Sequence, residues 1–311
     1  MKLFTALCAA ASLWLVAFAG SEAPDVRAVV LGIAQDGGLP HIGCAQPACA
    51  TARRDPARRE RVAALGLIDD AAGKRFLIDA TPDLPSQLES LNGGRRARAP
   101  ADRRRPVDGI LLTHAHVGHY TGLMYLGREA LGAQGVPVYA TPRMARFLRE
   151  NAPWSQLVAL GNVELRELVP ERELLLTSGL RVVARQVPHR DELSDTVGFV
   201  VRGPRRSLLY VPDIDKWERW ERPLEDEVGG VELAFLDGTF SAADEVPGRS
   251  LAEIPHPLVS ETIARLAARP ALGTRVLFIH LNHTNPLLWD AARRRELKAF
   301  RVAHDGEEHP L

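Results

Sequence analysis

Three histidines lie within six residues of the segment 109–123, GILLTHAHVGHYTGL: His114, His116 and His119. The apolar residues that precede them predict a buried strand, so the histidines would lie at the turn where that strand ends. A single histidine is more often structural than a ligand. Several imidazoles at one turn can instead bind a transition metal together, so this spacing predicts a metal site.

Four further candidate ligands follow predicted buried strands elsewhere in the chain. Asp79 ends FLIDA, His189 ends VVARQVPH, Asp213 ends LLYVPD and His280 ends RVLFIH. The ends of neighbouring strands can meet at one edge of a sheet, where an open metal site can form. Imidazole and carboxylate ligands suit zinc, and also iron or manganese. Two such metals bridged by a carboxylate would bind a water molecule and lower its pKa, so that it is held as hydroxide and can attack at neutral pH.

The elements that must position these residues are mainly strands with interspersed helices. Strands recur along the whole chain without a low-complexity tract, so we expect one domain over residues 20–311. Helical spacing of apolar residues predicts helices near the C-terminus. The segments with the clearest patterns are 26–34, 180–189, 196–203 and 206–213 for strands, and 257–270 and 286–300 for helices.

The first 19 residues have the layout of a secretory signal peptide. Lys2 is followed by an apolar stretch from Leu3 to Ala19, which ends in small residues. We expect cleavage after Ala19 and a periplasmic or secreted protein. The alternative is an uncleaved membrane anchor, for which the stretch is short.

The charge balance of the chain bears on which partners to expect. The chain of 311 residues has 39 acidic and 39 basic side chains. A formal net charge of zero gives no general reason to expect nucleic acid or an anionic membrane as partner. We expect a small-molecule substrate, no nucleic acid and no stable membrane association after signal cleavage. No pattern in the sequence indicates an oligomeric state.

These motifs resemble the metallo-β-lactamase fold superfamily over essentially the whole mature chain. The segments AQDGGLPHIGC, ATPDL, HYTGL, YVPDIDKWE, LDGTF and IHLNHTNPLL are similar to the pyrroloquinoline quinone biosynthesis B proteins. The C-terminal segments IHLNH and AHDGEE are also similar to the phosphodiesterase of phosphonate breakdown. The resemblance implies an α/β fold, a metallo-β-lactamase-type αβ/βα sandwich of two mixed β-sheets flanked by helices, with the metals at one edge.

The resemblance also implies a role for each candidate residue. Asp79 would orient the turn that carries the histidines by a hydrogen bond to a ligand histidine, and so fix the tautomer of that imidazole. We count Asp79 and Asp213 as catalytic. The metals would be one or two Zn²⁺ ions, with iron or manganese as alternatives. The ligands would be His114, His116 and His189 for the first metal, and His119, Asp213 and His280 for the second, with Asp213 bridging.

Gly118 stands where the resembling proteins have an aspartate, in the pattern H-x-H-x-D-H. That acid normally binds the second metal and can take the proton of the attacking water. Without it, we expect a mononuclear site, or a dinuclear site whose second metal binds weakly. Asp83, Asp215 or Asp237 could replace it as a proton acceptor, although each is more often an ordinary structural acid.

A second cluster lies in the loop PHIGCAQPAC, which places His41, Cys44 and Cys49 close together. In the resembling proteins a cysteine-rich loop at this position holds a structural zinc, and the resemblance makes His283 its fourth ligand. Two thiolates and two imidazoles form a closed tetrahedral site. The alternative is a Cys44–Cys49 disulfide, because an exported protein meets an oxidising environment and zinc needs both thiols reduced.

These features together predict a metal-dependent hydrolase that uses metal-bound hydroxide on an ester, phosphodiester or amide-type bond. One alternative is an oxidative enzyme related to pyrroloquinoline quinone biosynthesis, with iron in place of zinc. The other is a non-catalytic metal- or ligand-binding protein on the same fold. The biosynthesis proteins, as usually described, are not exported, which favours a relative that acts on another substrate.

Overall fold

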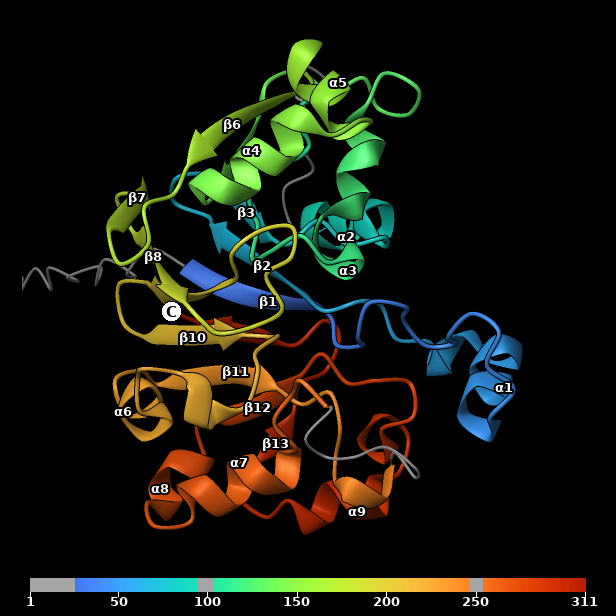
Figure 1. Ribbon diagram of the computed structural model, residues 1–311. Coiled ribbons are helices and arrows are strands. Elements are labelled where there is room, and N and C mark those ends of the chain that lie inside the picture. The colour runs from blue at the N-terminus through green and yellow to red at the C-terminus, as the bar shows by residue number, and fades with distance from the viewer. Residues whose placement is uncertain (1–25, 94–102, 246–253) are drawn as a thin grey trace, which may run out of the picture.

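The computed structural model describes residues 26–93, 103–245 and 254–311, and the predicted signal peptide lies outside these ranges. Two seven-stranded sheets pack face to face, and helices cover their outer faces (Figure 1). Each sheet contains parallel and antiparallel pairs. This confirms the predicted αβ/βα sandwich of two mixed β-sheets. Among the described residues, every helix is too short or too polar to span a membrane.

The first sheet has the strand order β14-β1-β2-β3-β4-β5-β6. Strands β3 to β6 run parallel, whereas β14, β1, β2 and β3 pair antiparallel. Its strands are β1 (Val26–Gly32), β2 (Ala64–Asp69), β3 (Lys74–Ile78), β4 (Gly109–Leu111), β5 (Val136–Ala140), β6 (Val163–Glu167) and β14 (Glu308–Pro310).

The second sheet has the order β13-β12-β11-β10-β9-β8-β7. Strands β10 to β13 run parallel, and β7 to β10 pair antiparallel. Its strands are β7 (Glu173–Thr177), β8 (Leu180–Gln186), β9 (Val197–Arg202), β10 (Ser207–Val211), β11 (Leu233–Asp237), β12 (Val276–Ile279) and β13 (Arg301–Val302).

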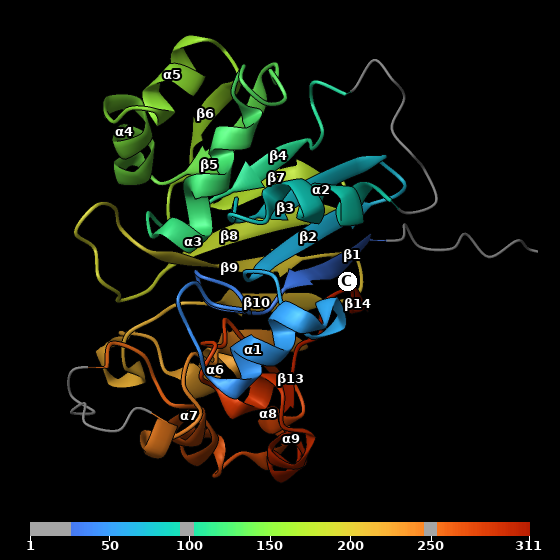
Figure 2. The same cartoon turned by 90° about the vertical axis from the view of Figure 1, so that its right-hand side faces the viewer.

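The helices form the two outer layers, with α2 to α5 on the first sheet and α6 to α9 on the second (Figure 1). Helix α1 lies at the side of the sandwich (Figure 2). The bounds are α1 (Pro47–Arg54), α2 (Leu84–Asn92), α3 (Val117–Tyr120), α4 (Pro142–Glu150), α5 (Trp154–Ala159), α6 (Leu224–Gly229), α7 (Val259–Leu266), α8 (Pro270–Gly273) and α9 (Ala291–Glu296).

The helix predicted over 286–300 is wrong in extent. A short 3-10 turn covers Pro286–Leu288, and α9 begins only at Ala291. Asp290 separates the two, because its side chain accepts hydrogen bonds from the backbone N–H groups of Ala292 and Arg293 and so caps a new helix.

Side chains of β1 alternate between two hydrophobic cores. Val26, Ala28 and Val30 face the core between the sheets, whereas Val29 and Leu31 face the core under the helices. Successive side chains of a strand point to opposite faces, so a strand covered on both sides must be apolar at nearly every position. This explains the continuous apolar runs in the sequence.

Candidate metal centre

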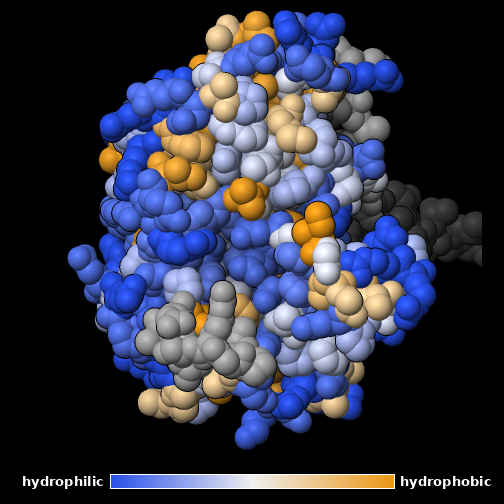
Figure 3. All heavy atoms as spheres, turned by 45° about the vertical axis from the view of Figure 1, so that its right-hand side comes forward, coloured by the Kyte–Doolittle hydropathy of each residue, from blue (hydrophilic) through white to orange (hydrophobic). Residues whose placement is uncertain are grey.

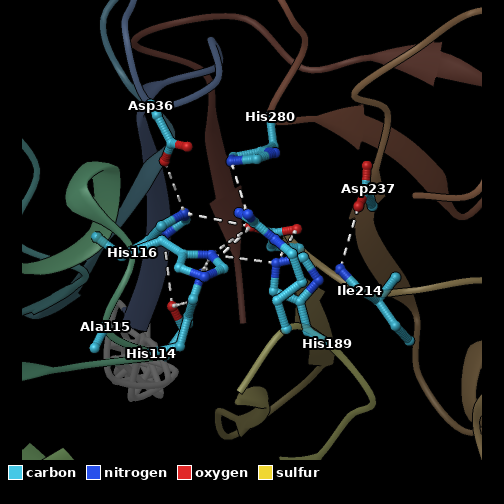
Figure 4. A network of polar contacts seen from close by, with 12 residues as sticks. Asp36, His114, Ala115, His116, His189, Ile214, Asp237 and His280 are labelled. Atoms are coloured by element: carbon cyan, nitrogen blue, oxygen red, sulfur yellow. Dashed lines mark hydrogen bonds and ion pairs between the residues drawn. The ribbon is translucent and has the colours of Figure 1, made fainter. Parts of the chain in front are cut away.

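The candidate ligands converge at one edge of the sandwich because parallel strands end there together. Asp79 follows β3, the histidines of 114–119 follow β4, and His280 follows β12. Asp213 follows β10 by two residues, and His189 lies in the loop after β8. Figure 4 shows the side chains of His114, His116, His189 and His280 turned towards one another.

The residues predicted for the first metal lie together. The ligand atoms of His114, His116, His189 and Asp213 are all within 4.8 Å of one another. His114 Nε2 lies 3.3 Å from Asp213 Oδ2, and His189 Nε2 lies 3.1 Å from Asp213 Oδ1. His116 Nδ1 is 2.9 Å from His114 Nε2 and 3.3 Å from His189 Nε2. Three nitrogens and one carboxylate thus face a single small volume.

The residues predicted for the second metal lie on the other side of the same carboxylate. The Nε2 atoms of His119 and His280 are each 3.9 Å from Asp213 Oδ2. Both histidines are fully buried, and Asp213 is 3% exposed. Asp213 therefore occupies the position between the two histidine groups that a bridging ligand requires.

Asp79 and Thr113 hold the outer nitrogens of two histidines. Asp79 Oδ1 accepts hydrogen bonds from the Thr113 N–H at 2.8 Å and from its hydroxyl at 2.9 Å. Asp79 Oδ2 lies 2.8 Å from His119 Nδ1, and Thr113 Oγ1 lies 2.9 Å from His114 Nδ1. Contacts on Nδ1 fix the tautomer and leave Nε2 to face inward. This geometry suits the orienting role predicted for Asp79.

Two further groups lie beside the outer nitrogens of two other histidines: Thr239 within hydrogen-bond distance of His280, and Asp215 at an ion-pair distance from His189. Asp215 Oδ1 lies 3.4 Å from His189 Nδ1, and Thr239 Oγ1 lies 3.0 Å from His280 Nδ1. Asp215 also accepts a hydrogen bond from Arg219 at 2.7 Å. Asp215, one of the acids considered as a replacement for the missing aspartate, is therefore placed to orient His189.

Two residues of the site have a left-handed backbone. Asp79 has φ 69° and His280 has φ 63°. For residues with a side chain this conformation costs about 1–2 kcal/mol each, and such strain concentrates at functional sites. The Asp79 N–H donates to Leu111 O at 2.8 Å, so pairing across the strand ends maintains the turn.

The electrostatics of the cluster favour binding of a cation. Burial lowers the pKa of His119, but Asp79, Asp36 and Asp213 outweigh it and raise this pKa to about 9. Burial likewise lowers the pKa of His189, and Asp213 and Asp215 raise it to about 9. Burial raises the pKa of Asp213, yet the surrounding histidines hold it well below its usual range.

Several inward-facing atoms have no hydrogen-bond partner within the described part of the chain. They are His119 Nε2, His280 Nε2, Asp213 Oδ1 and Asp36 Oδ1. A buried polar atom without a partner costs about 1–3 kcal/mol, and such atoms are rare in native structures. Nitrogen and carboxylate oxygen are also the ligands that Zn²⁺, Fe and Mn accept. The donor set therefore fits a metal centre.

Of the acids considered as replacements for the missing aspartate, Asp83 lies outside the centre. Its Oδ2 accepts a hydrogen bond from the Val62 N–H at 2.8 Å, near the start of α2. Asp237 is fully buried and borders the centre, since its ligand atom lies within 4.8 Å of those of Asp213 and His280, and its Oδ2 is 2.9 Å from His256 Nδ1. His256 is buried, and its Nδ1 lies 3.2 Å from Asp213 Oδ1.

Sequence reasoning missed Asp36. This residue lies in the turn after β1, and its Oδ1 is 3.5 Å from His119 Nε2. The ligand atoms of Asp36, His119 and His280 lie within 4.8 Å of one another. The available signal was an acid in the Gly-rich turn AQDGG, at the end of a predicted strand.

Three of the four residues predicted for the cysteine site lie together, and His41 does not. Cys44 and Cys49 are free thiols in this structure, so they do not form the alternative disulfide. The ligand atoms of Cys44, Cys49 and His283 lie within 4.8 Å of one another. His41 does not join this group: its ring stacks on His283 at 4.2 Å between centroids, and its Nδ1 lies 2.8 Å from Ile42 O.

The fold and the site together define a metallo-β-lactamase-type protein. A family model described as β-lactamase superfamily domain matches residues 74–281, and the chain belongs to this superfamily. The match spans the Asp79, His114–His119, His189, Asp213 and His280 positions.

Within this superfamily, the chain is similar to two groups of proteins. The chain is 29% identical to the coenzyme PQQ synthesis protein B of Methylobacterium sp. (strain 4-46), over 90% of this chain and 98% of that protein. It is 30% identical to the protein of the same name from Methylobacterium nodulans, with the same coverage of 90% and 98%. The structure of Zn²⁺-bound PqqB from Methylobacterium extorquens has a TM-score of 0.75 at 23% identity, covering 92% of this chain and 100% of that one. A diphosphatase from the PhnP family has a TM-score of 0.66 at 23% identity, covering 92% and 97%.

Proposed function

We propose that this protein is a metal-dependent hydrolase acting on an ester, phosphodiester or amide-type bond of a small molecule. The observation that carries the proposal is the convergence at the edge of the sandwich of imidazole nitrogens and carboxylate oxygens, several of which have no hydrogen-bond partner within the described residues. A protein that kept this fold for shape alone would gain nothing from buried atoms of this kind, because each one costs stability.

The ligands would be those predicted from the sequence. A metal bound there would activate water for attack and stabilise negative charge that develops in the transition state. His114, His116 and His189 would hold one metal, with Asp213 between it and the second. Asp79 and Thr113 would keep the histidine nitrogens turned inward, as their hydrogen bonds do in this structure.

A proton site adjoins the centre. His256 Nδ1 lies 2.9 Å from Asp237 Oδ2 and 3.2 Å from Asp213 Oδ1. Burial lowers the pKa of His256, but Asp237 and Asp213 raise it to about 10. The two carboxylates therefore favour a proton on His256, whose Nδ1 lies between them.

A cavity of about 410 Å³ adjoins the centre at His189. Its lining includes Arg219, Trp220 and Arg222, and its volume is in the range of small-molecule sites. Figure 3 shows a largely hydrophilic hollow on the side of the molecule that carries α1 and α3. A cavity of this size supports a small-molecule substrate.

The metal we propose is zinc, because histidine and carboxylate ligands suit it and the similar PqqB structure from Methylobacterium extorquens is Zn²⁺-bound. The name of the similar proteins, coenzyme PQQ synthesis protein B, supports a second candidate, a role in coenzyme PQQ synthesis, for which we propose an oxidative reaction with iron. Elemental analysis of protein purified without added metal separates the two. Zinc favours the hydrolase and iron favours the oxidative enzyme.

Hydrolysis is tested with chromogenic esters and with bis(p-nitrophenyl) phosphate. We expect turnover that disappears with a chelator, returns with zinc and falls by at least about 100-fold in Asp213→Asn, because that variant loses a shared ligand. Asp226→Asn is the control, since Asp226 pairs with Arg269 on the surface. Fully metallated protein that hydrolyses none of these substrates, nor an amide panel, would contradict the proposal.

We also propose that the chain is exported, on the strength of Lys2 and the apolar stretch up to Ala19. N-terminal sequencing of protein from the periplasm or the medium should begin at Gly20. Protein that keeps Met1 and stays in the membrane or the cytoplasm would contradict export.

A further inference from the structure

Gly118 is a glycine for reasons of space and not of backbone conformation. It lies in α3, and its φ is outside the left-handed region that favours glycine. A Cβ at this position would lie 2.1 Å from Asp36 Oδ1 and 2.7 Å from Asp36 Cα. Real Cβ atoms do not approach other atoms this closely, so Asp36 excludes any side chain from position 118.

The turn that carries Asp36 is attached to the strand end that carries His280. The Gln35 N–H donates to Leu281 O at 2.8 Å, and the Leu281 N–H donates to Ile33 O at 2.8 Å. The Gly38 N–H closes the turn on Gln35 O at 2.7 Å. Leu281, which follows His280, is therefore hydrogen-bonded to the turn through both its N–H and its carbonyl group. These bonds fix the position of Asp36 relative to His280.

The carboxylate of Asp36 is directed at the second histidine group. Its Oδ1 is 3.5 Å from His119 Nε2, and the ligand atoms of Asp36, His119 and His280 form one compact group. Each of these three ligand atoms lacks a hydrogen-bond partner within the described residues. Figure 4 shows Asp36 and His280 approaching from the same side.

We propose that Asp36 takes the place of the aspartate that Gly118 replaces and is a ligand of the second metal. The inference rests on the metal centre proposed above. The ligands of that metal would be Asp36, His119, His280 and the shared carboxylate of Asp213. The charge and the number of ligands expected at this position are then restored by a residue from another part of the chain, and the site is dinuclear.

A simpler role for Asp36 is to form an ion pair with protonated His119. In that case the protein would bind one metal at the centre, and removal of the carboxylate would leave metal binding unchanged. Metal stoichiometry therefore separates the two roles without reference to any substrate.

The test compares Asp36→Asn with Glu192→Gln, each titrated with cobalt(II) and zinc in place of the native metal. Glu192 is the control because its Oε1 lies 3.9 Å from His116 Nε2 while the side chain remains 56% exposed. Both variants remove one negative charge beside the histidines. Thiolate-to-cobalt absorption reports the cysteine cluster, so the histidine sites can be counted separately, and thermal melts of chelated protein check folding.

We expect two metals at the histidine centre of the wild type and of Glu192→Gln. In Asp36→Asn we expect one of them to bind at least about 100-fold more weakly, since the loss of a mere orienting group already costs 10–100-fold. In the exchange variant Asp36→Gly/Gly118→Asp the turn after β1 must also move, because a Cβ at position 118 lies 2.7 Å from the backbone Cα of residue 36. With that shift, the variant should regain part of this affinity relative to Asp36→Gly alone.

Three results would overturn the assignment of Asp36: a single histidine-bound metal in the wild type, two in Asp36→Asn with wild-type affinity, or an equal loss in Glu192→Gln. These outcomes are independent of turnover. Loss of the second metal in Asp36→Asn, combined with no hydrolysis by any form, would support the ligand and refute the hydrolase.

Discussion

Gly118→Ala is the smallest change that tests whether Asp36 occupies the space of a missing side chain. Alanine adds one methyl group and no ligand atom. In an ordinary helix the change from glycine to alanine stabilises a protein by about 0.5–1 kcal/mol. At position 118 the added Cβ would meet Asp36 Oδ1 at 2.1 Å and Asp36 Cα at 2.7 Å, so both the carboxylate and the turn must move.

The expected size of the effect follows from these distances. Overpacking in a well-packed region costs about 1–3 kcal/mol, which exceeds the helical gain and leaves a net loss of about 0.5–2 kcal/mol. For a chain of this size that lowers Tm by about 1–5 °C. Displacement of a ligand adds a second loss when metal is present, because a 100-fold weaker Kd removes up to about 2.7 kcal/mol of linked stabilisation.

The assay is a thermal melt of wild type, Gly118→Ala and Gly229→Ala, each with chelator and with excess zinc. Gly229 is the matched control: it ends α6, its φ is not left-handed, and a Cβ there would meet no atom of the described residues within 4 Å. We expect Gly229→Ala to be neutral or slightly stabilised in both conditions. A Gly118→Ala protein as stable as this control, with an undiminished response to zinc, would refute the reasoning.

Three other predictions concern separate features. Asp79→Asn should weaken the second metal 10–100-fold in a competition with a chelator, because His119 loses the carboxylate at its Nδ1, and unchanged affinity would show that Asp79 does not orient it. Cys44→Ser/Cys49→Ser should lose about one zinc per chain by elemental analysis, whereas undiminished zinc would argue against a cysteine site. Burial and Asp305 raise the pKa of Glu60 to about 7, so the folded protein holds its proton above the unfolded pKa of about 4.5. Stability should therefore fall as pH rises through this window, by up to about 2 kcal/mol after screening, and the pH profile of Glu60→Gln should lack this fall.

The sequence predicted the central strands well because their burial is nearly complete. Strand β2, for example, is buried at all of its positions, and its residues are apolar from Ala64 to Ile68. The strands β6 and β7 were missed because each lies at the edge of its sheet. Their residues, VELRE and ELLLT, are nearly all exposed or only half-buried, so the alternation that marks a half-buried strand is weak.

The candidate site was predictable where ligand type and strand end coincide, as for His189, Asp213 and His280. Asp36 was not, because its proximity to His119 depends on the pairing of the turn after β1 with Leu281, a contact between distant parts of the chain. The replacement acids considered from the sequence lay after other strands or at the start of a helix.

Gly118 need not indicate that the second metal has been lost. A metal requires a carboxylate at a point in space, and at the edge of this sandwich several turns lie within reach of the same point. The turn after β1 approaches α3 so closely that only one of the two can carry a side chain there. A carboxylate on Asp36 therefore requires a glycine at 118, and an aspartate at 118 would require both a small residue at 36 and a shift of the turn, because the Cα of residue 36 is itself too close. The two positions form one steric unit, so an incomplete motif has to be judged together with the residues that border the gap.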